Sequence, residues 1–373
     1  MSGAGFRAAE GAGASWSEAA KACADGLMPH AEGATLGFLY ATEAIGDHLG
    51  SVLAFMRERT RIPHWVGSVG LGVCAAGREY FGQPAVSALV TDLPEQGFRV
   101  FGPECSTEAL MATERDWFKI EQPSFAVVHG DPRDSKIAEK IATTSGSAGL
   151  YLVGGLAAAM TAPPRQIAER VTEGGLSGVI LTQGLAVATG LTQGCSPIGP
   201  LRRVTAAREN ILMRIDDRPA LEVFKEDIGE LLARDLRRVG GRIFVGIPVR
   251  GSDTGDYIVR NLMAIDTERN WIAIGEQLAP GDPVMFSRRD ATSALEDLRR
   301  MLEQLKRRAG GPPKAGLYFS CVARGPNLFG TDSEELRTIR DALGEFPLAG
   351  FFGNGEIAHD RLYGYTGVLT LFL

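Results

Sequence analysis

Cysteine is scarce in this 373-residue chain, and no cysteine pair is present. The five cysteines are widely spaced and odd in number, and none belongs to a CxxC motif. Disulfide-stabilised secreted domains and zinc ribbons need cysteines paired at characteristic spacings. The sequence therefore argues against both classes, and it predicts a reducing, cytoplasmic location.

Long apolar runs are also missing. The two most apolar stretches, 150–160 and 178–191, fall short of the roughly 18 residues that a membrane-spanning helix needs. Residues 1–16 lack the apolar core of a secretory signal. We therefore expect no membrane partner.

Positive charge is not in excess. The chain has 39 Lys and Arg against 45 Asp and Glu, which gives a formal net charge of −6. A nucleic-acid-binding surface needs basic side chains that replace counterions on phosphate. The one basic run, 306–308, falls near the end of a predicted amphipathic helix, where cations favour the helix dipole. We therefore expect no nucleic-acid partner.

The common catalytic signatures are absent as well. The sequence contains no HExxH, no GxSxG and no Walker lysine motif. These patterns identify zinc proteases, α/β-hydrolases and P-loop nucleotidases respectively. The sequence thus predicts no catalysis of these kinds.

Glycine, by contrast, is abundant. The 47 glycines are scattered without a period, which indicates tight turns and close backbone approaches instead of a collagen or linker sequence. With 45% hydrophobic and 23% charged residues, the composition is that of a globular protein long enough for two domains.

The last stretch, 316–373, has the clearest pattern. It predicts a strand, a polar loop, a helix, a glycine-rich turn and a closing strand. Thr331 and Glu334 form a possible capping box for a helix that carries Leu336 and Ile339 on one face. Polar residues at both ends of these elements are where binding groups usually lie.

Two other stretches show the same order of elements. Residues 37–93 align with 316–373, and 124–182 resembles a third β-α-β-β unit. Gly67, Gly154 and Gly350 then fall in comparable places, which we interpret as turns. The similarity indicates either duplication, with units arranged pairwise, or only a common local pattern.

The polar segments of the closing stretch supply the candidate binding site. Arg324 can present a planar guanidinium to a carboxylate or phosphate, or it can form an internal ion pair, for instance with Glu356. Asn354 and Glu356 flank Gly355, and they could bind a ligand's amine or satisfy the turn's backbone.

Cys321 has three possible roles. With His359 as base and Glu356 as orienting carboxylate it could be a thiol nucleophile. It could also form part of a ligand pocket, or pack as a small apolar side chain. The sequence alone does not place these residues within hydrogen-bond distance of one another.

Six short segments carry a family resemblance in this order: GCSPIGP (194–200), DRPAL (217–221), VRN (259–261), SRRDA (287–291), CVARG (321–325) and AGFFGNGEI (349–357). Together they resemble the FIST family of sensory domains. Ser15 and Glu18 form a capping box that predicts a helix after a short tail, and we assign both to an N-terminal segment over 1–34. The resemblance implies a FIST N-type domain over 35–215 and a FIST C-type domain over 216–373. It also implies small-ligand binding, with amino acids among the proposed ligands and haem with a nitric-oxide response in some members.

We therefore predict an α/β (α+β) fold of FIST type, built from related β-α-β-β units with mixed and antiparallel sheets. The predicted function is sensing of a small anionic or zwitterionic, amino-acid-like metabolite, with output through a signalling protein. The predicted site residues are Cys321, Arg324, Asn354, Gly355 and Glu356. The alternatives are a haem-binding nitric-oxide sensor with His129 or His359 as axial ligand, a protein–protein adaptor, and a cysteine-dependent enzyme.

Overall fold

The chain folds into two compact units, which we describe from a computed structural model that covers residues 5–28, 31–249 and 255–373. Unit 1 joins residues 1–192 to 297–373, and unit 2 comprises 193–296. Unit 2 is thus an insertion in the sequence of unit 1. The predicted domain boundary at 215/216 falls inside unit 2, so the compact units divide the chain differently from the predicted sequence domains.

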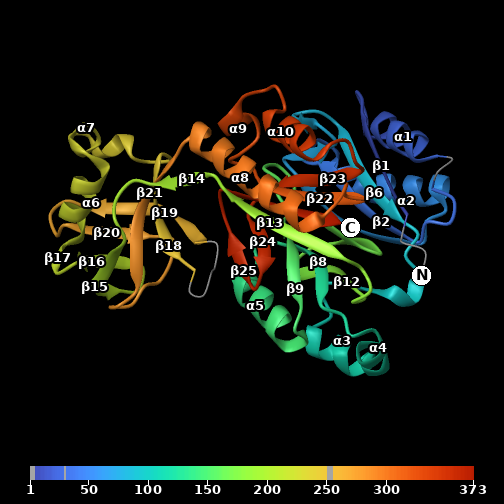
Figure 1. Ribbon diagram of the computed structural model, residues 1–373, viewed down its shortest axis with the longest axis horizontal. Helices are drawn as coiled ribbons and strands as arrows, with labels where there is room; N and C mark the ends of the chain where they lie inside the picture. Colours follow the sequence, from blue (N-terminus) through green and yellow to red (C-terminus); the bar gives the residue numbers. More distant parts are fainter. Residues whose placement is uncertain (1–4, 29–30, 250–254) are drawn as a thin grey trace. The chain divides into compact units, whose positions relative to one another are not determined.

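The predicted mixed α/β class is confirmed by three six-stranded sheets in unit 1 (Figure 1). The first has the order β1 (Phe6–Ala12), β6 (Ala85–Thr91), β2 (Leu36–Thr42), β3 (His64–Gly70), β10 (Gln166–Ala168) and β11 (Arg170–Thr172). The second has the order β7 (Phe98–Phe101), β12 (Leu176–Leu181), β8 (Phe125–Gly130), β9 (Tyr151–Leu156), β24 (Glu356–His359) and β25 (Arg361–Tyr363). The third has the order β13 (Val187–Gln193), β26 (Thr366–Phe372), β22 (Ala315–Cys321), β23 (Leu348–Gly353), β4 (Gly72–Ala75) and β5 (Arg78–Phe81).

These sheets come from three copies of one unit, and not from the pairwise arrangement that we expected. In each copy a first strand runs parallel to a second, and a closing strand pairs antiparallel to the first. We call the copies repeats 1, 2 and 3. Their first, second and closing strands are β2, β3 and β6, then β8, β9 and β12, then β22, β23 and β26.

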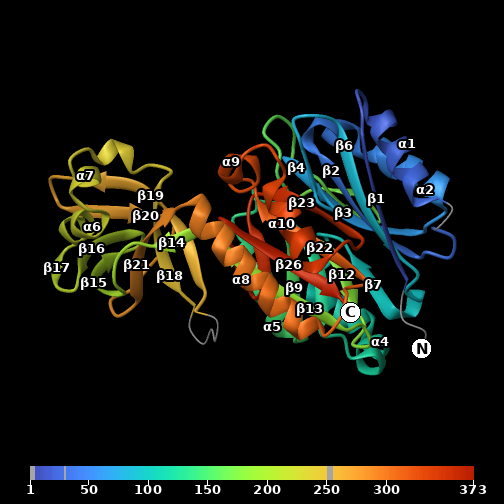
Figure 2. The same cartoon turned by 45° about the horizontal axis from the view of Figure 1, so that its top comes forward.

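Each repeat gives a hairpin to a neighbouring repeat. The hairpin β4–β5 of repeat 1 extends the sheet of repeat 3, β10–β11 of repeat 2 extends that of repeat 1, and β24–β25 of repeat 3 extends that of repeat 2. Figure 1 shows the last exchange as β24 and β25 beside β9, and Figure 2 shows β13 beside β26 and β22. The exchange is cyclic, so every sheet contains chain segments that are distant in sequence.

Two helices follow the sequence signals to different degrees. Helix α1 (Trp16–Leu27) begins at Ser15, whose hydroxyl accepts the backbone N–H of Glu18 at 3.3 Å as the capping box predicts. Helix α10 (Glu334–Leu343) exists as predicted, but its N-cap is Ser333 in a left-handed conformation with no side-chain cap bond. Glu334 pairs with Arg337 at 2.6 Å instead of capping the helix.

The remaining elements of unit 1 are short or cover the sheets. They are η1 (Glu43–His48), α2 (Leu49–Thr60), η2 (Glu95–Gly97), α3 (Thr107–Thr113), α4 (Arg115–Glu121), α5 (Ile137–Ala148), α8 (Ala291–Ala309) and α9 (Pro326–Phe329). Helix α8 spans the sequence boundary between the two units.

Three glycines allow the parallel strands of the repeats to approach each other closely. Gly67, Gly154 and Gly350 lie within second strands, and not in turns as we predicted. A Cβ atom on any of them would lie 1.8 Å from a carbonyl oxygen of the paired first strand, that of Leu39, Val128 or Tyr318. Only glycine permits such a close approach of two backbones.

The residues after these contacts form the centre of unit 1. Tyr40, His129 and Phe319 occupy equivalent positions in the three first strands, and their ring centroids lie 5.6, 6.0 and 6.3 Å apart. Phe351 of repeat 3 stacks on Tyr40 at 5.2 Å and completes this aromatic centre. The three repeats therefore share one core.

Unit 2 is an antiparallel sheet with a packed helix. Its strands are β14 (Cys195–Pro197), β21 (Pro283–Arg289), β15 (Arg202–Arg208), β16 (Ile211–Ile215), β20 (Trp271–Ile274), β19 (Tyr257–Asp266) and β18 (Ile243–Pro248), in that order. β18 also pairs with β21, so the sheet closes on itself. Helix α6 (Ala220–Ile228) contributes Leu221 and Phe224 to the core of this unit. The shorter elements are β17 (Arg218–Pro219), α7 (Glu230–Ala233) and η3 (Leu236–Arg238).

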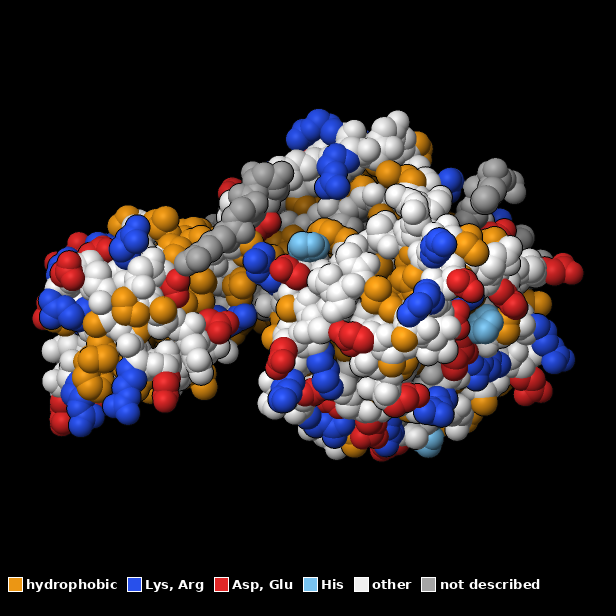
Figure 3. All heavy atoms as spheres, turned by 90° about the horizontal axis from the view of Figure 1, so that it is seen from below, with side chains coloured by type: hydrophobic (Ala, Val, Ile, Leu, Met, Phe, Trp, Pro, Cys, Tyr) orange, Lys and Arg blue, Asp and Glu red, His pale blue; other side chains and the backbone are white. Residues whose placement is uncertain are grey.

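No helix within the described parts of the chain is long and apolar enough to cross a membrane. On the face seen in Figure 3, the acidic and basic side chains of unit 1 are interspersed.

Candidate functional site

The polar residues of repeat 3 meet in a buried ionic network. Arg324, in the loop after β22, is completely buried, and its Nε donates to Oε1 of Glu335 at 2.7 Å. Glu335, in the first turn of α10, is also completely buried. The ion pair that the sequence allowed between Arg324 and Glu356 is thus made with Glu335, because α10 places this carboxylate under the loop.

Three further donors surround Glu335. The hydroxyl of Tyr318 donates to Oε1 at 2.5 Å, and that of Ser320 lies 3.3 and 3.2 Å from the two oxygens. The backbone N–H of Gly325 donates to Oε2 at 3.2 Å. Both oxygens of Glu335 therefore have hydrogen-bond partners.

Arg324, by comparison, does not use all of its hydrogen-bond donors. Its Nη1 and Nη2 are buried and have no hydrogen-bond partner among the residues that the structure describes. The guanidinium lies 5.3 Å from the ring centroid of Phe329 on α9. Burial acts to lower the pKa of Arg324, but nearby Glu335, Tyr318 and Glu356 raise it overall, so the group stays charged. A buried cation with unpaired donors calls for a further partner.

Glu356 supplies an unpaired acid group to the same network. It is completely buried on β24, and its Oε2 accepts the backbone N–H and the hydroxyl of Thr366 at 3.1 and 2.7 Å. Its Oε1 has no partner in the described part of the chain. Burial raises the pKa of Glu356 from 4.5 to about 8, against the opposing effects of Thr366, Arg324 and the Cys321 side chain.

Glu79 comes from the hairpin that repeat 1 gives to repeat 3. Its Oε1 accepts the backbone N–H of Leu336 at 3.4 Å. Burial, followed by the charge of Glu335, raises the pKa of Glu79 to about 8. Sequence reasoning missed both Glu79 and Glu335, since Glu79 precedes Glu335 by most of the chain and Glu335 looks like an ordinary helix residue.

Cys321 is placed for packing more than for chemistry. It is 7% exposed, and burial followed by the charge of Glu356 raises the pKa of its thiol. His359 is exposed, and its Nδ1 pairs with Asp360 at 3.1 Å. A buried thiol with a raised pKa is a poor nucleophile.

The other repeats suggest a structural role for position 321. Thr42 holds the corresponding position in repeat 1 and Asp131 that in repeat 2. Thr42 Oγ1 accepts the N–H of Ala85 at 3.0 Å, and Asp131 Oδ2 accepts that of Gly174 at 2.9 Å. The thiol of Cys321 likewise takes a backbone hydrogen bond from Tyr365. In all three repeats this side chain ties the first strand to the start of the closing strand.

Asn354 and Gly355 form the turn between β23 and β24. The side chain of Asn354 is exposed, and its backbone N–H donates to Leu156 at 3.0 Å. The carbonyl of Gly355 accepts the N–H of Leu156 at 2.8 Å. The structure thus brings Cys321, Arg324 and Glu356 together, while Asn354 lies at the surface beside them.

Neither histidine named for haem fits an axial ligand in an open apolar pocket. His129 is completely buried among the rings of Tyr40, Phe319 and Phe351, and burial lowers its pKa to about 3. His359 is exposed and paired with Asp360. No group of three potential metal-ligating side chains is found among the described residues.

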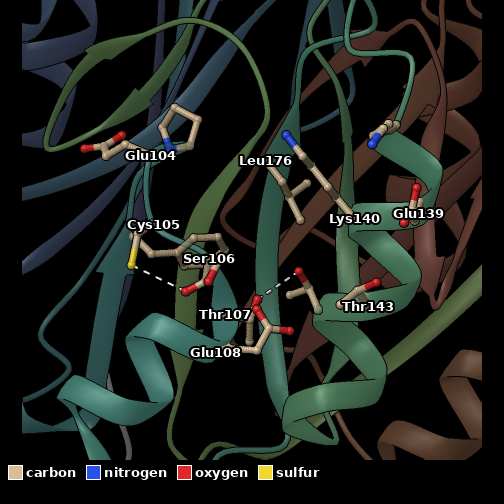
Figure 4. A pocket seen from close by; sticks show the side chains of 13 residues that line it. Glu104, Cys105, Ser106, Thr107, Glu108, Glu139, Lys140, Thr143 and Leu176 are labelled. Atoms are coloured by element: carbon tan, nitrogen blue, oxygen red, sulfur yellow. Dashed lines mark hydrogen bonds between the residues drawn. The ribbon is translucent and has the colours of Figure 1, made fainter.

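A cavity lies in repeat 2, away from these residues (Figure 4). It has a volume of about 380 Å³ and lies between α3 and α5. Thr107 and Thr144 are hydrogen-bonded at its wall at 2.9 Å, and Lys140 and Glu104 also line it. Because carboxylates and ammonium groups are mixed around the cavity, its charge selects no single class of ligand.

The network predicts a specific pH dependence of stability. A carboxyl group whose pKa rises on folding favours the folded state at low pH, and this contribution is lost as the pH rises from about 4.5 towards 8. Glu356→Gln removes the titration. We expect the variant to gain roughly 2–4 kcal/mol relative to wild type between about pH 5 and pH 9. Urea unfolding at both pH values measures this difference, and parallel profiles for the two proteins would contradict it.

The comparisons with known proteins cover nearly the whole chain. Residues 35–218 match the FIST N domain, and residues 220–359 match the FIST C domain. A protein of Mycobacterium tuberculosis described as uncharacterized is 31% identical over 356 residues, which is 91% of each chain. A similarly described protein of Mycobacterium bovis is 28% identical over 360 residues, or 92% of this chain and 91% of the relative.

Among solved structures, the cyanuric acid hydrolase of A. caulinodans aligns with 99% of both chains. Its sequence identity is 9% and its TM-score 0.38. At this level the likeness carries no argument about activity.

Proposed function

Because this chain belongs to the FIST family, whose domains are sensory and bind small ligands, we propose that it senses a small anionic or zwitterionic molecule at the Arg324 site. Binding is reversible and involves no chemical change of the ligand. The output passes to a signalling protein. Arg324 and Glu356 make the polar contacts, Cys321 forms part of the wall, and Asn354 and Gly355 form the rim.

The observation that carries this proposal is the unpaired half of the Arg324 guanidinium. A fully buried arginine normally uses its planar donors in bidentate contacts with carboxylate or phosphate. Here one donor binds Glu335, and two nitrogens have no partner in the described structure. A ligand carboxylate would satisfy both.

The route to the site involves α9. Phe329 on this helix lies against Arg324, and α9 is flanked by Gly325 and Gly330, both with positive φ. Residues 326–330 are partly or fully exposed. Movement of this short segment about the two glycines gives a ligand access to the buried guanidinium.

The test is a thermal-shift and NMR titration with small carboxylates and amino acids. Arg324→Lys keeps the charge but loses the planar fork, so we expect its affinity for each hit to fall about tenfold or more. Arg337→Lys, on the exposed side of α10, is the matched control and should bind as wild type does. If Arg324→Lys binds every hit as tightly as wild type, the proposed site is wrong.

A further inference from the structure

The two oxygens of Glu356 have different surroundings. Oε2 accepts two hydrogen bonds from Thr366, whereas Oε1 is buried and has no partner in the part of the molecule described. An oxygen that accepts two donors is the carbonyl-like oxygen of a carboxylic acid. When Glu356 is protonated, its proton therefore lies on Oε1, where it is free to be donated.

The unpaired atoms of Arg324 are donors as well. The register of β22 and β23 pairs Cys321 with Gly353, and Arg324 and Glu356 each lie three positions further along the chain, so both come from the same end of this strand pair. With Glu356 protonated, the site therefore offers two guanidinium nitrogens and one carboxylic O–H. A protonated carboxylic acid in an apolar setting can act as a hydrogen-bond donor to an anion.

Burial favours the protonated form of Glu356, and the charge of Arg324 acts in the opposite direction. The titratable groups near Glu356 are Arg324 and Cys321, from β22 and the loop after it, and Tyr363 from the paired strand β25. Arg324 in turn has Glu335 on α10 and Glu79 on β5 as neighbours. Glu335 already neutralises Arg324. An ionised Glu356 would thus add a second carboxylate to a buried site whose cation is already paired with Glu335, which is costly.

We propose that the site binds a small oxyanion of single charge, such as a carboxylate, between the Nη atoms of Arg324 and a protonated Glu356. Glu356 is then a hydrogen-bond donor to an anion and not the acceptor of a ligand's ammonium group. This inference rests on the proposed function and narrows its ligand class from anionic or zwitterionic to anionic.

A protonated Glu356 makes binding depend on pH. The pKa of about 8 means that the O–H donor is present at neutral pH and is lost above it. Affinity for a carboxylate should therefore fall up to about tenfold for each pH unit above 8. In Glu356→Gln an amide N–H₂ can replace the O–H at all pH values, so its affinity should stay constant.

The experiment compares acetate, glycine and methylammonium as probes. Binding to wild type, Glu356→Gln and Arg324→Lys is measured by NMR titration at about pH 6.5 and about pH 9.5, with chloride matched for ionic strength. Glu334→Gln, at a partly exposed residue of the same repeat, is the control for the loss of a carboxylate.

We expect wild type to bind acetate more tightly than glycine or methylammonium, and to bind it about tenfold or more weakly at the higher pH. Glu356→Gln should bind acetate with the same affinity at both pH values. Tighter binding of glycine that is lost in Glu356→Gln would overturn the inference, as would the absence of acetate binding. Arg324→Lys separates the two proposals. If this variant binds the probes as wild type does, the proposed site is wrong. If the variant loses binding while wild type prefers glycine to acetate, only the assignment of an anionic ligand is wrong.

Discussion

Glu335→Ala lowers the free energy of unfolding by roughly 3–5 kcal/mol, the expected cost of leaving a buried charge unpaired. The substitution removes the carboxylate that neutralises Arg324 and accepts from Tyr318, Ser320 and Gly325. Arg324 is fully buried and cannot turn to water without disrupting the loop. Urea unfolding near neutral pH measures the loss.

The adjacent residue provides a matched control. Glu334 pairs with Arg337 at 2.6 Å, and both side chains are partly exposed. Surface pairs of this kind contribute about 0–1 kcal/mol, so Glu334→Ala should change stability little. If both variants lose the same free energy, the Arg324–Glu335 pair is not the buried structural element described here.

A double substitution separates the cost of an unpaired charge from the value of the pair. Replacing Arg324 with Met and Glu335 with Leu removes both charges from the buried site. Apolar replacement of a complete buried ion pair is often neutral or stabilising. The double variant should therefore recover part of the stability lost in Glu335→Ala, because the unpaired cation is gone while the donors of Tyr318, Ser320 and Gly325 still lack an acceptor. It should not bind acetate. A role of Arg324 in ligand binding would explain why the protein has a buried ion pair that adds little net stability.

Gly350→Ala is expected to prevent folding, or to cost more than about 4 kcal/mol. The added Cβ would lie 1.8 Å from the carbonyl oxygen of Tyr318, and neither backbone can move without breaking the parallel pair β22–β23. Gly67→Ala and Gly154→Ala should behave alike because the same contact recurs in repeats 1 and 2. Soluble yield and circular dichroism of the purified variants measure the effect.

Gly364→Ala is the control for this series. It lies in repeat 3 before the closing strand, and a Cβ there meets no atom within 4 Å. Its φ is not in the positive region, so the substitution should be close to neutral. If Gly350→Ala proved as stable as wild type, the close approach of the two strands would not be needed for the repeat to fold.

The three repeats differ at residues around the proposed site of repeat 3. Leu39 and Val128 stand where repeat 3 has Tyr318, the donor to Glu335. Ser68 and Gly155 stand where it has Phe351, which fills the aromatic centre. The repeats therefore share a backbone architecture, and only repeat 3 has the Tyr318 hydroxyl that binds Glu335.

Local sequence patterns determined the fold class and several elements. The Ser15 capping box and the apolar face of 334–343 predicted helices that the structure confirms. The three stretches with the same order of elements correspond to the three repeats. The six motif segments indicated the FIST family. These signals depend on contacts between residues near in sequence, so periodicity and capping reveal them.

Only the tertiary structure decided which polar groups meet. The hairpin exchange brings Glu79 beside Leu336, 257 positions away, and no local pattern encodes such a pairing. Burial then turned Arg324 from an apparent loop residue into an enclosed cation, and Glu335 from a helix-surface residue into its counter-ion. The physical reason is that strand pairing and desolvation are set by what packs from elsewhere in the chain, and both the charge state of Glu356 and the free donors of Arg324 depend on that packing.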